Sequence, residues 1–394
     1  MSLDFKAVRN QVKEMGENAA ERERRLQALR EQARGLLESN ANQQEAARQK
    51  VLRAARSFDP TLRCAVPTSE PLNQAFSASP QLRTATILAA DGSQIEPSRH
   101  LPVDYCLINL GAIQMRTGAP EAPLTMVRTE LMYAEQLYTE TGTLTDAALA
   151  LSRDLKERTL LAELAAEAQP PVVAFTDGPI ELWGGKDADG TASFHDSLKA
   201  YLKSLGKLCH LNTAVAGYVD KPAANLVVRL LEVLQTPESE LNGIRTIRPL
   251  RGVRDMDLFS ALLQPGERSA VFEIQSKSAV LYQDELALHF FYLNVGREGN
   301  PWFARVEIPA WVAKDADMLD LLQATLIGQC RVLGSRPFPY LLHRAHEAAV
   351  VTREEQEQVT HMIIMELLRR GVAFGSASQK QALKDLPKKT RYAG

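Results

Sequence analysis

The pattern that most constrains the fold is an apolar run that ends in an acidic, glycine-containing turn. It occurs twice, as ATILAADGS at residues 85–93 and as VVAFTDGP at residues 172–179. Short apolar runs bounded by turn residues are typical of buried strands. Each run therefore predicts a strand that ends at an aspartate, Asp91 or Asp177. Aspartate–glycine is also a common β-turn pair, so it is the recurrence, together with His346 far along the chain, that predicts an acidic, metal-binding site.

The overall composition is that of a globular protein. The chain has 394 residues, of which 45% are hydrophobic and 24% charged, enough for a large core and more than one structural unit. The net charge of -2 means that a polyanion would need a local basic patch. The first residues lack the layout of a signal peptide, and no apolar run is long enough to span a membrane, so we predict a cytoplasmic protein. The four cysteines form no CxxC pair, which predicts buried free thiols rather than a zinc ribbon.

The chain is predicted to have three parts. Residues 1–58 are rich in Glu, Arg, Gln and Ala with apolar residues at helical spacing, which predicts an N-terminal helical arm, a long helix or a helical hairpin broken near Gly35 or residues 39–42. The apolar stripe is thin, so the arm either packs on the main body or a second subunit, or remains solvated. Residues 59–375 form the main domain. Residues 376–394 form a flexible basic tail.

Strand-like and helical segments alternate through the main domain, which predicts an α/β or α+β core with a mixed sheet. No GxGxxG or GxxxxGK[ST] motif follows a strand, so a nucleotide-cradling loop is not indicated. The predicted helices cover residues 126–140, 146–168, 223–235, 316–333 and 353–370, and the further strands cover residues 214–219, 270–274, 286–295 and 303–308.

Carboxylates from two strand ends and a helix suit two-metal hydrolysis of a phosphodiester. Mn²⁺ and Mg²⁺ both prefer oxygen ligands, and Mn²⁺ also accepts an imidazole, which would be that of His346. Among the helical acids we favour Glu157, because Leu151, Leu155 and Leu161 mark the inward side of its helix. Glu130 and Glu163 are the alternatives.

The order of five motifs resembles the NurA family of DNA-repair nucleases. The resemblance covers residues 80–375, and its motifs are ADGSQI (90–95), TDGPIELW (176–183), AGYVDKP (216–222), RVEIPAWVA (305–313) and PYLLHRAH (339–346). It implies a ribonuclease-H-like mixed sheet flanked by helices, a manganese-dependent 5'-3' exonuclease that also cuts single strands, a homodimer, and a HerA-type hexameric translocase as partner in end resection. Asp91, Asp177 and His346 match the family's metal ligands, and Glu157 matches its helical acid. Phe338 stands where the resemblance leads us to expect a tyrosine.

Basic residues are the candidates for DNA contact. Arg245, Arg248, Arg251 and Arg254 recur every third residue, and in an extended segment they would follow a phosphate backbone. A solvated or partner-facing loop is the alternative. Arg99, shortly after the first acidic turn, is a further candidate.

The sequence thus predicts a metal-dependent deoxyribonuclease with Asp91, Glu157, Asp177 and His346 as ligands. The main alternative is a non-catalytic DNA clamp that regulates the translocase ATPase, for which the missing tyrosine is the hint. A metal-dependent phosphatase acting on small molecules is a third possibility. Clustered carboxylates without a cation would be costly, which favours a metal enzyme.

Overall fold

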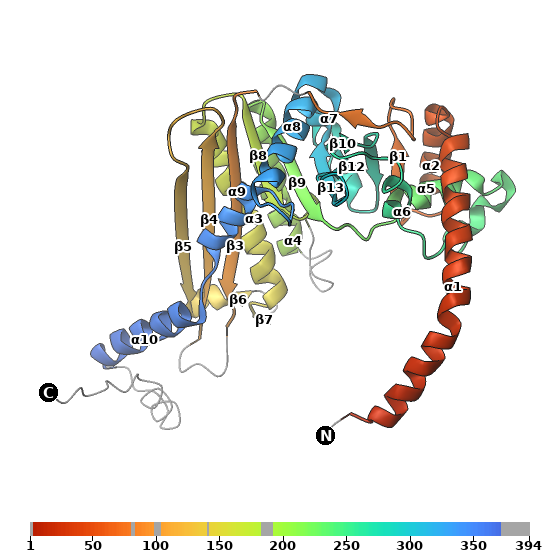
Figure 1. Ribbon diagram of the computed structural model, residues 1–394. Coiled ribbons are helices and arrows are strands. Elements are labelled where there is room, and N and C mark those ends of the chain that lie inside the picture. The colour runs from red at the N-terminus through yellow and green to blue at the C-terminus, as the bar shows by residue number, and fades with distance from the viewer. Residues whose placement is uncertain (1–2, 80–82, 98–103, 140–141, 183–191, 372–394) are drawn as a thin grey trace. The chain divides into compact units, whose positions relative to one another are not determined.

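The computed structural model describes residues 3–79, 83–97, 104–139, 142–182 and 192–371 (Figure 1). They form two compact units, each assembled from segments that are distant in the sequence. The first unit contains Met1–Thr84, Val173–Glu181 and Leu208–Tyr340, and the second contains Ala85–Val172, Leu182–Lys207 and Leu341–Gly394. The chain therefore passes from one unit to the other five times.

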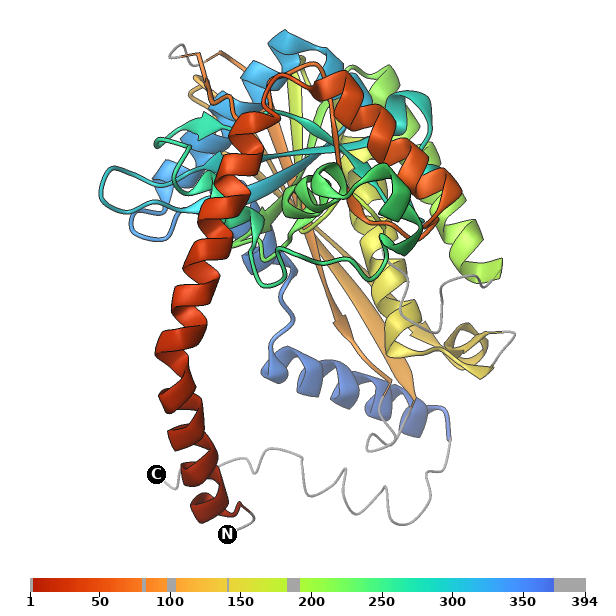
Figure 2. The ribbon, with the colours of Figure 1, turned by 90° about the vertical axis from the view of Figure 1, so that its right-hand side faces the viewer.

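The first unit begins with a helical hairpin, α1 (Phe5–Ser39) and α2 (Gln44–Ser57), which confirms the expected arm (Figure 2). The break lies at residues 40–43, where the Asn40 side chain donates to the carbonyl of Leu36, whereas Gly35 lies inside α1. Arg34 donates to the carbonyl of Asp257, and Lys50 donates to the carbonyls of Leu234 and Thr236. The second half of α1 and all of α2 are thus packed on this unit.

A mixed sheet forms the centre of the first unit. Its strand order is β1-β11-β12-β13-β9-β8, in which β8 (Val172–Asp177) and β9 (Ala214–Asp220) are parallel and the other pairs are antiparallel. Aromatic rings of Phe259, Phe272, Phe290 and Tyr292 stack in its fully buried core. The other strands are β1 (Cys64–Pro67), β2 (Phe76–Ser77), β10 (Glu267–Arg268), β11 (Phe272–Gln275), β12 (Leu288–Asn294) and β13 (Phe303–Pro309).

Helices of the first unit follow these strands and bury their apolar faces. Eight of the ten residues of α5 (Leu226–Gln235) are buried, which marks it as a core helix. The other helices are α6 (Asp255–Phe259), α7 (Ala310–Lys314) and α8 (Ala316–Val332), with short 3₁₀ turns η2 (Glu238–Gly243), η3 (Ala279–Leu281) and η4 (Asp284–Leu286).

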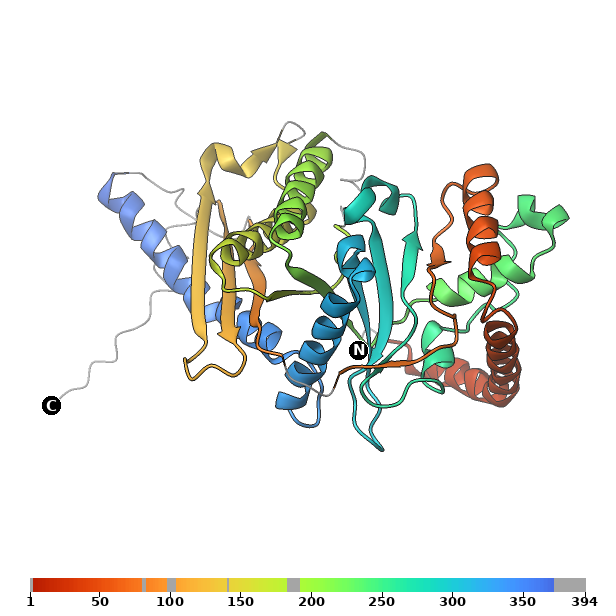
Figure 3. The ribbon, with the colours of Figure 1, turned by 90° about the horizontal axis from the view of Figure 1, so that it is seen from above.

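The second unit is built on three long antiparallel strands, β3 (Thr86–Ile95), β4 (Tyr105–Arg116) and β5 (Leu124–Tyr133) (Figure 3). Helix α3 (Asp146–Glu167) packs on β3. Helix α10 (Arg353–Arg369) packs Val359 and Ile363 against the buried side chains of Ile95, Tyr105 and Leu107. The remaining elements are α4 (Ala192–His210), α9 (Tyr340–Ala349), η1 (Ala134–Leu137), β6 (Tyr138–Thr139) and β7 (Gly142–Thr143).

One element differs in type from the prediction. Residues 124–133 form strand β5 and not a helix, and they pair with β4 over ten residues. Nine of its ten residues are exposed. Its sequence therefore lacks the regular alternation of apolar and polar residues that identifies a half-buried strand. Backbone hydrogen bonds to β4 stabilise the strand and override the weak local preference of the sequence for a helix.

The succession of elements is that of a ribonuclease-H-like fold: three antiparallel strands, a helix, a strand, a helix and a strand parallel to the previous one, here β3, β4, β5, α3, β8, α4 and β9. The predicted mixed sheet flanked by helices, with an N-terminal helical arm, is confirmed. None of the helices within the described ranges has the length and apolar character to cross a membrane. Cys64, Cys106, Cys209 and Cys330 are free thiols, and all but Cys209 are buried.

Candidate active site

Asp91 lies inside strand β3 and not at a turn, which corrects the prediction for this segment. Strand β3 continues to Ile95, with Asp91 opposite Gly111 and Gly92 opposite Leu110 of β4. Successive side chains of a strand point to opposite faces, so position 92 faces α3 when Asp91 faces the other way. A methyl group on Gly92 would lie 2.7 Å from both Cγ of Arg153 and Oε1 of Glu157. This glycine therefore serves close packing of α3 and not a turn.

Helix α9 crosses the Asp91 face of the sheet at Gly111. A methyl group there would lie 2.5 Å from the backbone oxygen of Ala345 and the backbone nitrogen of Ala349. The end of α9 is also held by hydrogen bonds, because Ser93 and Asn109 both donate to the carbonyl of Ala349, at 2.5 and 2.8 Å. These contacts fix the helix against β3 and β4.

This packing brings His346 to Asp91. The Nδ1 atom of His346 lies 2.6 Å from Oδ2 of Asp91, although the two residues are 255 positions apart in the chain. An ionised carboxylate only accepts hydrogen bonds, so Nδ1 donates, and in the neutral imidazole Nε2 keeps its lone pair for another partner. The Asp91 side chain is 16% exposed and that of His346 is 63% exposed, so the pair lies at the surface of the second unit.

Glu157 is the buried acid of α3. Burial is the main cause that raises the pKa of its carboxyl to about 8; Arg158 and Arg153 oppose the shift, and the negative charges of Asp154 and Asp91 add to it. Its Oε1 lies 3.2 Å from Nε of Arg153. The alternatives Glu130 and Glu163 are half exposed and form surface ion pairs with Lys156 and Arg128. Glu130 lies on strand β5 and not on a helix, which corrects its prediction as a helical acid, and of the three acids Glu157 is the one that is buried.

Asp177 ends β8 in the first unit, and the turn predicted there is present. Gly178 has a φ of +80° and donates from its backbone nitrogen to the carbonyl of Tyr218 at 2.9 Å. The next residues are held by Glu307, which accepts from the backbone nitrogen of Ile180 at 3.0 Å. A methyl group on Gly217 would lie 2.6 Å from the carbonyl oxygen of Gly178, so β9 must carry glycine here. The turn is rigidly positioned within its unit.

The four predicted ligands are thus distributed over two units. Asp91 and His346 are in contact, and Glu157 reaches β3 from the α3 side at Gly92. Asp177 belongs to the other unit. Within the described ranges, no three His, Cys, Asp or Glu side chains are gathered as metal ligands would be.

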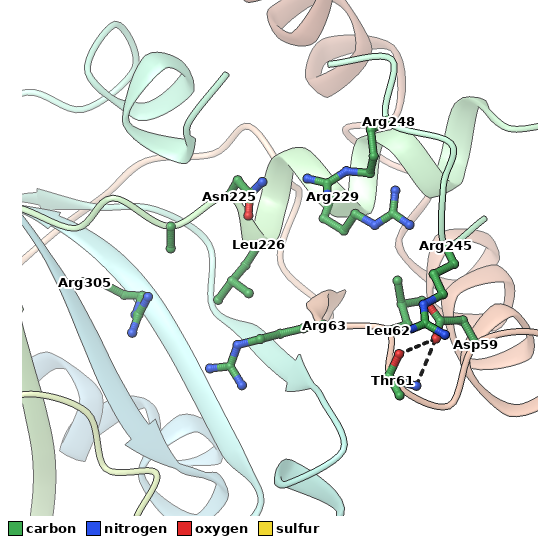
Figure 4. A pocket seen from close by; sticks show the side chains of 11 residues that line it. Asp59, Thr61, Leu62, Arg63, Asn225, Leu226, Arg229, Arg245, Arg248 and Arg305 are labelled. Atoms are coloured by element: carbon green, nitrogen blue, oxygen red, sulfur yellow. Dashed lines mark hydrogen bonds between the residues drawn. The ribbon is translucent and has the colours of Figure 1, made fainter. Parts of the chain in front are cut away.

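The arginines predicted to contact DNA do not form one extended row. Residues 244–246 and 249–252 form turns, and the backbone nitrogen of Arg254 donates to Asp257 at the start of α6. Arg245 and Arg248 instead line a cavity of the first unit together with Arg63, Arg229 and Arg305 (Figure 4). Sequence spacing singled out Arg245 and Arg248 but not Arg63, Arg229 and Arg305, which come from other segments of the chain. Arg99 lies outside the described residues.

Phe338, the departure from the expected tyrosine, has a packing role in the first unit. Its ring meets the buried ring of Tyr218 edge to face, with centroids 5.5 Å apart. Such aromatic pairs are stabilising without any hydroxyl group.

Comparison with known proteins identifies the family. The sequence model of the NurA domain matches residues 85–351, more than half of the chain. The chain belongs to the NurA family. This membership supports a nuclease as the class of protein.

Solved structures share only a loose likeness with the chain. Endonuclease V of Ciona intestinalis, in complex with a 24mer DNA containing an inosine followed by a ribo-adenosine, is 12% identical with a TM-score of 0.34, and the match covers 79% of this chain and 95% of that one. The catalytic domain of human endonuclease V is 13% identical with a TM-score of 0.30, covering 73% and 85%. These scores carry no argument about function. A comparison with curated protein sequences finds no match.

Proposed function

We propose that this chain is a divalent-metal-dependent deoxyribonuclease, a 5'-3' exonuclease with single-strand endonuclease activity. The observation that carries the proposal is the contact between Asp91 and His346, which joins a carboxylate and an imidazole across two distant segments of a NurA-family chain. Oxygen and imidazole ligands together fit Mn²⁺, with Mg²⁺ as a second choice. The raised pKa of Glu157, to which Asp91 contributes, also fits a site in which carboxylates await a cation.

Asp91, Glu157, Asp177 and His346 would hold the metal. A bound divalent ion supplies a Lewis acid and a water of lowered pKa. The residues of this chain contribute the geometry: Ser93 and Asn109 anchor α9, α9 presents His346, and the carboxylate of Asp91 orients the imidazole through Nδ1. His346 would thereby be set to exchange a proton at Nε2.

Cleavage of end-labelled single- and double-stranded DNA with Mn²⁺, with Mg²⁺ or with EDTA tests this proposal. We expect the wild type to cleave with Mn²⁺ and to be inactive in EDTA. Asp91→Asn should reduce the rate at least about 100-fold, because a lost metal ligand removes several kcal/mol of transition-state stabilisation. His343→Ala changes an exposed histidine one turn before His346 on α9 and, as the control, should cleave at the wild-type rate. Equal activity of wild type and Asp91→Asn would contradict the assignment.

The proposal includes a homodimer and a HerA-type translocase as partners in the resection of DNA ends at double-strand breaks, as family membership implies. The first half of α1 is the surface that supports a protein partner, because Phe5, Val8, Val12 and Met15 are all exposed on it. A chain that begins at Arg22 would lose these four residues and keep the packed part of the arm. We expect it to fold and to lose co-purification with the translocase. Retained binding would exclude this surface.

A further inference from the structure

The first unit contains an arginine-lined cavity that the nuclease chemistry does not use. Its volume is about 420 Å³, within the range of small-molecule sites. Five guanidinium groups line it, from the segment before β1, from α5, from the turn that follows η2 and from β13 (Figure 4). They belong to Arg63, Arg229, Arg245, Arg248 and Arg305.

Buried carboxylates hold four of these arginines in place. Glu181 accepts from Arg63 at 2.8 Å, and Glu307 accepts from Arg305 at 2.7 Å. Glu232 accepts from both Arg229 and Arg248, at 2.9 and 2.8 Å. All three glutamate side chains are fully buried. Arg229 also donates to the carbonyls of Ile244 and Ile247. A guanidinium has five N–H donors in one plane, so the bond from Nε of Arg248 to Glu232 fixes the orientation of this group and leaves its Nη donors for a ligand.

The charge balance of the cavity points to an anionic ligand. Its five guanidinium groups are accompanied by four carboxylates, those of Glu181, Glu232 and Glu307 and that of Asp59, which also lines the cavity. Arg245 is exposed at the rim, and within the described ranges no carboxylate lies at ion-pair distance from it. An arginine cluster with an uncompensated member attracts negative charge.

We infer that this cavity binds the phosphate group of a small phosphorylated molecule, of the size of a nucleoside mono- or diphosphate. Phosphate offers several acceptor oxygens to converging guanidinium groups, and arginine binds it in a bidentate, charge-assisted manner. The polar groups of Thr61 and Asn225, which also line the cavity, supply partners for the rest of such a molecule. A DNA strand carries the same phosphate chemistry, so the test includes both sources.

Isothermal titration calorimetry of the full-length protein with pyrophosphate and with dAMP tests the inference. EDTA in the buffer keeps the Asp91 region free of metal, so the result is independent of the nuclease proposal. We expect the wild type to bind with a dissociation constant below about 1 mM, and Arg245→Ala to bind at least about tenfold more weakly. Arg56→Ala is the matched control, because Arg56 is exposed at the end of α2 in the same unit and does not line the cavity.

A second variant, Arg248→Gln, tests whether weaker binding comes from the loss of a guanidinium group and not from a change of the fold. Arg248→Gln leaves Glu232 paired with Arg229, so the wall should remain intact while one cavity guanidinium is lost. It should also weaken binding, with unchanged circular dichroism. Absence of binding by the wild type, or equal binding by Arg245→Ala, overturns the inference. Binding of a 5'-phosphorylated oligonucleotide that depends on Arg245, without binding of pyrophosphate or dAMP, overturns it in favour of a DNA contact.

Discussion

Asp91-Gly92 and Asp177-Gly178 follow apolar runs of similar length, yet their backbones differ. Gly92 continues strand β3 within a regular antiparallel register, whereas Gly178 has a φ of +80° and ends β8. At Gly92 the missing side chain makes room for Arg153 and Glu157 of α3. At Gly178, apart from its two neighbours in the chain, no atom of the described residues lies within 4 Å of the position that a Cβ would occupy, so only the backbone conformation requires glycine.

The comparison shows that the same dipeptide can place a carboxylate by two physical means. Asp91 is held by sheet pairing and by α9, which lies against Gly111 and presents His346. Asp177 is held by a turn whose following residues bond to Glu307. Packing positions Asp91, whereas backbone conformation positions Asp177. Substitutions near the two aspartates should therefore differ in how they affect stability and cleavage.

The largest effect is expected at Asp177 itself. If Asp177 is a metal ligand as proposed, Asp177→Asn should lower the rate of Mn²⁺-dependent DNA cleavage at least about 100-fold, the same loss as is expected for Asp91→Asn. Asp196→Asn, at an exposed position of α4, is the control and should keep full activity. An Asp177→Asn protein with normal cleavage would show that the two Asp-Gly segments have separate roles.

A smaller but distinctive effect is expected for Glu157→Gln. The pKa of Glu157 is raised from 4.5 to about 8 in the folded protein. The protonated carboxyl therefore contributes to the free energy of unfolding fully below about pH 4.5, and this contribution is lost as the pH rises through about 8. In EDTA, the free energy of unfolding of the wild type should therefore fall by a few kcal/mol relative to that of Glu157→Gln between about pH 5 and about pH 9. Urea unfolding at both pH values measures the difference. Parallel pH profiles of the two proteins would rule out a raised pKa.

Gly111→Ala tests whether the close packing of α9 on β4 positions Asp91 and His346. The new methyl group would meet the backbone of α9 at 2.5 Å, and a helix backbone cannot rotate away as a side chain can. We expect a loss of about 1–3 kcal/mol in the free energy of unfolding, with a displaced α9 and reduced cleavage. Gly206→Ala is the matched control, because Gly206 lies in α4 with open space around it, and alanine should stabilise that helix slightly. Equal stability of the two variants would contradict a tight α9 contact.

The smallest effect is expected at Gly178. Alanine meets no neighbour there but must adopt a positive φ, which costs about 1 kcal/mol. Asparagine tolerates this region better, so Gly178→Asn should be destabilised less than Gly178→Ala in thermal unfolding. If Gly178→Ala were more stable than Gly178→Asn, the turn would not depend on a left-handed backbone conformation at this position.

Several elements could be predicted from local pattern alone. The helix at 146–167, the strands at 214–220 and 303–309 and the helical hairpin at the N-terminus all follow from apolar spacing and breaker residues, and each matches within a few residues. Strand β5 could not be predicted, because an edge strand with exposed residues has no burial alternation to detect. The prediction that four arginines form one row was wrong for a related reason. A spacing of three residues indicates a shared face only if the backbone is regular, and turns interrupt the backbone in this segment.

The sequence by itself determined the α/β class and the succession of most helices and strands, because these depend on composition and on short-range periodicity. Only the tertiary structure decided that Asp91 lies within a strand, that Gly111 admits α9 so that His346 reaches Asp91, and that five distant arginines share one cavity. These features depend on contacts between segments far apart in the chain. Such contacts are fixed by steric fit and charge pairing, which no local pattern encodes.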